Sequence, residues 1–184
     1  SVQVAGLSPT QVAAMQTEDV AALTNSTLNA LSASQIKTLS TAQVVGLSTA
    51  QASALNKVFA ASLTSAQLQA METADLVKLT TSAIQALNNN TLAGLTTAQV
   101  ANLGTAQVAV LTDLQIKQMS TANIQALSSD QAKVLKQAQL GALTSAQVAA
   151  MDTVDLAQLN SAQIGALSGA GLAGLSTTQL VNLG

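Results

Sequence analysis

The sequence predicts an all-α solenoid built from very short helices, with one helix in each eight-residue repeat. Leucine or methionine occupies every eighth position from Leu7 to Leu183, and the spacing never slips. Each repeat also contains a signal for the start of a helix. Finally, a period of eight is incompatible with one long amphipathic helix, since about 100° per residue would rotate the leucine column by about 80° per repeat.

The repeat, called an octad below, begins at its leucine, and residues 143–150 (LTSAQVAA) are a clear copy. The second and fifth places, Thr144 and Gln147, form a capping box. In this motif the hydroxyl accepts from the Gln147 backbone N–H, and the glutamine side chain accepts from the Thr144 N–H. The first and sixth places, Leu143 and Val148, match a hydrophobic staple. Helices are therefore expected to begin after the second place and to end before the next leucine.

Three further features agree with this placement of helix starts and ends within the octad. Pro9 falls at the first helical position, where a missing N–H costs nothing. Acidic residues lie between the cap and the third helical position, and four lysines lie near the helix end, as the helix dipole favours. Glycines occur at the eighth place, where helices stop. The acids are Glu18, Asp19, Glu72, Asp75, Asp113, Asp130, Asp152 and Asp155; the lysines are Lys37, Lys78, Lys117 and Lys133; the glycines are Gly6, Gly46, Gly94 and Gly174.

A β-solenoid is the less favoured alternative, because the octad is rich in alanine, leucine and glutamine rather than β-branched residues. Helices of about six residues do not persist alone, so octads must stack and share a core. We expect each octad to contribute its leucine and its sixth-place aliphatic residue. Alanines at the fourth and eighth places, such as Ala146 and Ala150, are expected to allow close backbone approach.

Related octads begin at Met15, Met71 and Met151, and they are separated by an odd and then an even number of octads. If alternate octads occupied different environments, duplication should keep these separations even. The mixture of odd and even separations therefore favours octads that are all related by one screw operation, rather than octads paired as hairpins. No internal boundary is visible, so residues 1–184 are interpreted as one continuous array. Because neither end differs from the other octads, we expect the sequence to be an excerpt of a longer array or its ends to stack on other copies.

Composition excludes several functions. The chain has no cysteine or histidine, one phenylalanine and a net charge of −2. Without cysteine there is no disulfide framework or thiolate metal site. The absence of a basic cluster argues against nucleic-acid binding. Polar residues interrupt every apolar run, which argues against membrane insertion. No cofactor is implied.

No catalytic, cofactor-binding or metal-binding residue is assigned. The pairs Glu72/Asp75 and Asp152/Asp155, and the adjacent Glu18 and Asp19, resemble cation or acid–base sites. Their positions near helix starts are, however, accounted for by capping and the helix dipole. Calcium requires more clustered oxygens, and no histidine is present to activate a hydroxyl nucleophile. We therefore expect the protein not to be an enzyme.

Two other features have functional and structural interpretations. Phe59 replaces the usual glutamine beside Ala60, and it either fills core volume or serves as a docking aromatic; the core interpretation is favoured. With Ala52 nearby, residues 51–62 form a candidate softer stretch. Threonines at the third place predict an outward ladder that could order water or accept glycans, although their tolerance at this position is the simpler explanation. They are Thr41, Thr49, Thr73, Thr81, Thr97, Thr105, Thr121, Thr153 and Thr177.

The runs LSTAQVVGLSTAQ, LTTAQVANLGTAQV and LTSAQVAAM resemble the LTTAQ-type octapeptide arrays of very large bacterial secreted or surface proteins of the adhesin type. The resemblance covers the whole chain and implies an extracellular or cell-surface structural role as a rod, spacer or filament. It brings no site residue. The alternatives are a scaffold for a protein partner and ice or carbohydrate binding through the threonine ladder. End-to-end self-association is the expected partnership.

Overall fold

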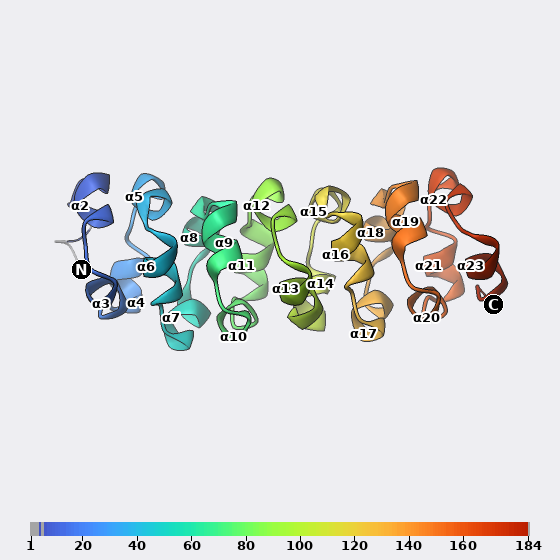
Figure 1. Ribbon diagram of the computed structural model, residues 1–184, viewed down its shortest axis with the longest axis horizontal. Helices are drawn as coiled ribbons and strands as arrows, with labels where there is room; N and C mark the ends of the chain where they lie inside the picture. The colour runs from blue at the N-terminus through green and yellow to red at the C-terminus, as the bar shows by residue number, and fades with distance from the viewer. Residues whose placement is uncertain (1–3, 5, 184) are drawn as a thin grey trace. The chain divides into compact units, whose positions relative to one another are not determined.

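The computed structural model describes residues 4 and 6–183, and the described part contains short α-helices and no strands (Figure 1). The chain divides into two compact units, Ser1–Leu95 and Thr96–Gly184. Each octad from residue 7 to residue 182 forms one helix of four to six residues. The sequence-based prediction of one short helix per octad is confirmed.

The helices begin at the third place of the octad throughout. In the first unit they are α2 (Pro9–Ala13), α3 (Thr17–Ala21), α4 (Asn25–Leu28), α5 (Ala33–Thr38), α6 (Thr41–Val45), α7 (Thr49–Ala54), α8 (Lys57–Ser62), α9 (Ser65–Ala70), α10 (Thr73–Leu76), α11 (Thr81–Ala86) and α12 (Asn89–Ala93). In the second unit they are α13 (Thr97–Asn102), α14 (Thr105–Ala109), α15 (Asp113–Gln118), α16 (Thr121–Gln125), α17 (Ser129–Lys133), α18 (Gln137–Ala142), α19 (Ser145–Ala150), α20 (Thr153–Leu156), α21 (Ser161–Ile164), α22 (Gly169–Ala173) and α23 (Thr177–Val181).

The predicted start signals operate as expected. Pro9 occupies the first turn of α2, after the Ser8 cap. At α19 the Gln147 N–H donates to the Thr144 hydroxyl at 3.2 Å, and the Thr144 N–H donates to the Gln147 side-chain oxygen at 2.9 Å. Between helices, the chain takes an extended conformation at each cap, as in Ser40 with φ −68° and ψ 159°. Each octad is therefore a closed local unit of one helix and one extended link.

Within each unit, the chain coils so that each helix packs against the helix three octads further along. In the first unit α2 packs on α5, α5 on α8 and α8 on α11; in the second, α16 packs on α19 and α19 on α22 (Figure 1). Three octads therefore make one turn of the coil. The expectation that octads are equivalent rather than paired as hairpins is confirmed inside each unit.

The core contains three residues from each inner octad rather than the two expected. The leucine and the sixth-place aliphatic residue are buried, as Leu143 and Val148 illustrate. The fifth place is buried as well, and Gln147 is only 3% exposed. At about 25 cal/mol per Å², the apolar layers stabilise the stacking of helices too short to persist alone. The buried fifth place adds mostly polar side chains to this core.

The eighth place, but not the fourth, brings backbones close together. Ala146 at the fourth place is exposed, so the expectation for that position is wrong, while Ala150 at the eighth is half-buried. A methyl group added at Gly174 would lie 3.0 Å from the Ser145 carbonyl carbon on α19. Gly174 has φ −80°, which any residue adopts. Its small size is therefore required by close packing between turns rather than by a left-handed cap.

Candidate functional site

Buried glutamines recur at the fifth place of many octads, and this series is called the glutamine ladder below. Gln147 in α19 shows its geometry. The side-chain Oε1 accepts from the Thr144 N–H, which closes the capping box. The Nε2 donates to the carbonyls of Met119 at 2.8 Å and Ile116 at 3.0 Å, one turn earlier in the coil. One side chain thus serves the start of its own helix and the end of another.

This two-ended arrangement recurs in both units. The Nε2 of Gln67 donates to the carbonyls of Leu39 at 2.8 Å and Ile36 at 2.7 Å. That of Gln139 donates to the carbonyls of Leu111 at 2.8 Å and Val108 at 2.9 Å. The carbonyls lie at helix ends, where backbone acceptors have few partners within their own helix; those of Ile36 and Val108 each accept one backbone N–H there, from Leu39 and Leu111. The ladder therefore supplies donors to carbonyls at helix ends and connects successive turns.

The glutamine ladder leaves little capacity to bind a ligand. Among the described residues, every buried side-chain nitrogen or oxygen atom has a hydrogen-bond partner. Both ends of the Gln147 amide are engaged with backbone groups at 2.8–3.0 Å. A ligand that approached these groups would have to displace hydrogen bonds that hold the turns together. The geometry therefore favours a structural role for the ladder.

At one octad, phenylalanine interrupts the ladder, and a residue of the preceding turn compensates. Phe59 is 1% exposed, so the prediction that it fills the core is confirmed. It cannot accept from the Asn56 N–H as glutamine does, and the Asn29 side-chain oxygen accepts this hydrogen bond at 2.8 Å. The Asn29 Nδ2 also donates to the Ala54 carbonyl at 2.8 Å. We call this pair of cross-turn hydrogen bonds the asparagine clasp.

The acidic pairs do not act as side-chain caps. Within the described chain, Glu72 and Asp152 stand at the caps of α10 and α20, yet their side chains make no capping hydrogen bond. The capping interpretation is therefore wrong for these two residues. Asp75 and Asp155 occupy the fifth place and are buried, whereas Glu18 and Asp19 are exposed. In the described residues, no group of three acidic side chains is arranged to hold a metal ion.

Asp155 replaces a ladder glutamine with a carboxylate. Its Oδ1 accepts a hydrogen bond from the Ser129 hydroxyl of α17 at 2.6 Å. Burial raises the pKa of the Asp155 carboxyl above its ordinary value, and the negative charge of Asp152 raises it further. The Ser129 hydrogen bond lowers the pKa and offsets part of this effect. The carboxyl is thus less readily ionised in the folded chain than in water.

The third-place threonines do not form one ladder, because consecutive octads lie around the coil and only every third octad stacks. In the second unit, Thr105 belongs to the column of α14, α17, α20 and α23, whereas Thr97 and Thr121 belong to the column of α13 and α16. Most of these threonines are exposed, as expected. The expectation of a single continuous ladder is wrong, and any ordered face would consist of short columns.

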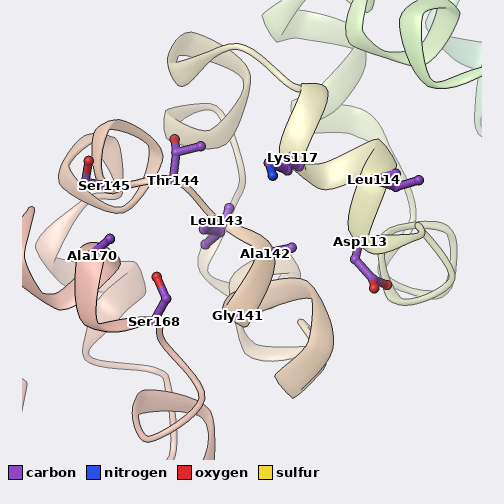
Figure 2. Close-up of a pocket in the computed structure, with 10 residues that line it drawn as sticks. All are labelled: Asp113, Leu114, Lys117, Gly141, Ala142, Leu143, Thr144, Ser145, Ser168 and Ala170. Atoms are coloured by element: carbon purple, nitrogen blue, oxygen red, sulfur yellow. The ribbon is translucent and has the colours of Figure 1, made fainter.

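A shallow groove of about 540 Å³ lies in the second unit, between α15, α18, α19 and α22 (Figure 2). Leu114 at its edge is 60% exposed and points away from Lys117, which extends toward the side of the groove formed by Thr144. The groove is lined by Asp113, Leu114, Lys117, Gly141, Ala142, Leu143, Thr144, Ser145, Ser168 and Ala170. It therefore combines one amine, one carboxylate and several hydroxyls with small apolar side chains.

These features define a helical repeat protein in which stacked octads share a core and a buried glutamine ladder. The family model of the ALTTAQ repeat matches residues 68–105 and 148–184. The chain thus carries LTTAQ-type repeats, in agreement with the resemblance seen in its sequence. No curated protein matches the chain. None of the described helices has the length and apolar character needed to cross a membrane.

Of the two hydrogen-bonding roles of a ladder glutamine, the sequence predicts that of Oε1 but not that of Nε2. It assigned Oε1 of Gln147 to the capping box, which is correct. It gave no role to Nε2, although a glutamine amide carries two donors that must be satisfied when buried. The unassigned donors of a fifth-place glutamine were the available signal for contacts between turns. The partner carbonyls are not encoded in the octad itself.

Proposed function

We propose that this repeat protein serves as a rod, spacer or filament element at or outside the bacterial cell surface, and that it is not an enzyme. The observation that carries the proposal is the glutamine ladder, because its buried side-chain amides donate hydrogen bonds to backbone carbonyls of the preceding turn. Within each unit, helices pack on those one turn before and after, as in solenoids that grow by adding equivalent repeats. The surface placement is supported by the resemblance to secreted arrays.

Chains of different length test the proposal. We expect variants with three octads added or removed to change contour length by equal steps in electron microscopy, while helix content per residue stays constant. An insertion of four residues is the matched control, because it breaks the phase of the ladder. A particle that does not lengthen with added octads would contradict a spacer role. Microscopy and surface proteolysis of the native source cells would test the fibre and its location.

We also propose end-to-end association between copies of the 184-residue chain. In the last turn of the second unit, Leu172 and Leu180 are 39% and 52% exposed, whereas Leu140 and Val148 in earlier turns are 0% exposed. Burial against another copy would remove this apolar surface from water. A contact between opposite ends repeats into a fibre unless rotation closes it.

Sedimentation at rising concentration tests this association. Wild-type chains are expected to lengthen with concentration, and Leu180→Glu is expected to suppress the effect. Leu114→Glu is the matched control, because Leu114 is 60% exposed, slightly more than Leu180, but lies on α15 rather than in the last turn. A strict monomer at high concentration would contradict end-to-end association while leaving a covalently continuous array possible.

The second candidate function is a scaffold for a protein partner. The observation that favours it is the groove beside the exposed Leu114, which has both charged and hydroxyl-bearing walls. A lysate partner captured by the wild-type chain, and lost with Leu114→Glu, would support this function. Ice or carbohydrate binding through threonines is less favoured, because the threonines are divided among separate columns. Ice recrystallisation and glycan-array assays test that alternative.

A further inference from the structure

Asp155 breaks the chemical pattern of the ladder at a joint between two turns. Its neighbours at the fifth place, Gln147 and Gln163, donate Nε2 hydrogen bonds to the carbonyls of Met119 at 2.8 Å and Leu135 at 2.7 Å. The carbonyl at the equivalent register for Asp155 is that of Leu127. Asp155 is 5% exposed, so it is buried at the same fifth place of its own octad. The joint between α17 and α20 thus presents a carboxyl where Gln147 and Gln163 present an amide donor at theirs.

The protonation state of this carboxyl decides which hydrogen bonds it can make. An ionised carboxylate only accepts, so it uses the Ser129 hydroxyl, 2.6 Å away, and offers nothing to backbone carbonyls. A protonated carboxyl gains one O–H donor and keeps acceptor capacity for the Ser129 hydroxyl. The neutral form is therefore the better match to a site that is built for an amide.

The electrostatic surroundings act in the same direction. Asp155 lies on α20, which packs against α17 and α23. Its own octad adds the negative charge of Asp152, and α17 carries Asp130 and Lys133, both exposed. The sequence of α23 (TTQLV) has no charged residue. Burial and Asp152 raise the pKa of the Asp155 carboxyl, and the Ser129 hydrogen bond offsets this rise only in part.

We propose that the joint between α17 and α20 is strengthened by acid, because Asp155 takes up a proton within the folded array and becomes a hydrogen-bond donor to the preceding turn. The sign follows from linkage. With a folded pKa above the unfolded value of about 3.9, the folded state binds more protons than the unfolded state. The contribution of Asp155 to stability is thus greatest below the unfolded pKa. It declines as the pH rises through the folded pKa. This property concerns the joint itself and does not depend on the spacer function.

The test is a carboxyl titration of the full chain by carbon-13 NMR, combined with hydrogen exchange of backbone amides in α17 and α20 after correction for intrinsic rates. Asp155 is expected to titrate at higher pH in the folded chain than in the chain unfolded by urea. Protection of the α17 and α20 amides is expected to fall as the pH rises from mild acid to neutrality. Asp155→Asn should remove this pH dependence, because its amide is neutral and keeps a donor throughout. Asp130→Asn is the control, and it should retain the dependence.

Three results would overturn the proposal. They are an Asp155 titration in the folded chain at or below that in the unfolded chain, wild-type protection that is constant or rises with pH, and an unchanged pH dependence in Asp155→Asn. If the Asp155→Asn chain fails to fold, the titration and exchange of the wild-type chain still decide the matter. Ser129→Ala provides a second variant: losing the hydroxyl that favours the ionised form should move the Asp155 titration to still higher pH.

Discussion

Replacing Gln147 with alanine should weaken the array locally by about 2–3 kcal/mol. Three short hydrogen bonds disappear, to the Met119 carbonyl at 2.8 Å, to the Ile116 carbonyl at 3.0 Å and from the Thr144 N–H at 2.9 Å. At about 1 kcal/mol net each, they contribute about 3 kcal/mol, and the Met119 carbonyl, which loses this donor, adds to the loss. Replacement by alanine also avoids the entropy cost of ordering the glutamine side chain, which is up to about 2 kcal/mol. Subtracting this term from the lost hydrogen bonding gives the net value.

Hydrogen exchange is the appropriate assay, because an array of repeats need not unfold in one step. Amides of α15 and α19 should lose protection together, since Gln147 joins these two turns. Gln118→Ala is the matched control: Gln118 is exposed on α15, and surface changes usually fall within about 0.5 kcal/mol. If Gln147→Ala costs no more than Gln118→Ala, or affects α19 alone, the ladder does not hold the turns together.

Three further predictions concern packing and capping. In chemical denaturation, Leu143→Ala should lower the free energy of unfolding by about 2–5 kcal/mol, because it leaves a cavity. Thr144→Ala should lower it by only about 1 kcal/mol, through loss of the helix cap. A larger loss for Thr144→Ala than for Leu143→Ala would show that the assigned places within the octad are wrong. Gly174→Ala should cost about 1–3 kcal/mol, because the added methyl meets the α19 backbone. Gly169→Ala has open space and should be neutral or stabilising by up to about 1 kcal/mol, so equal thermal shifts for both would refute this packing argument. Asn29→Ala should remove the asparagine clasp and lower the local stability by about 1–3 kcal/mol, so that proteolysis near α8 becomes faster. An unchanged cleavage rate near α8 would contradict this role of the clasp.

The local structure was predictable because its causes lie within one octad. The Thr144 hydroxyl and the Gln147 Oε1 act three residues apart, and Pro9 acts at its own helix start. The number of octads per turn was not predictable, since it depends on the angle at each extended link and on packing between distant helices. The same limitation explains why Ala146 was expected to allow close backbone approach and why the threonines were expected to form one ladder.

The candidate site was predictable only in part. The phase placed Asp155 near a helix start, but its burial and its contact with Ser129 depend on the turn of the coil that lies beneath it. The compensation of Phe59 by Asn29 likewise joins residues from different turns. Neither pair shares an octad, so no comparison of octads with one another reveals them. The absence of a catalytic or metal-binding residue remains a prediction.

The asparagine clasp has a consequence for how such an array can change in length during evolution. For octads that carry a ladder glutamine, gain or loss of one octad brings another equivalent octad beneath it, so the joint is preserved. Asn29 and Asn56, and likewise Ser129 and Asp155, are matched to one specific partner in the adjacent turn. Gain or loss of a single octad between the members of such a pair would separate them. Mutations that create pairs of this kind therefore turn freely exchangeable repeats into fixed ones, and they limit where recombination can act.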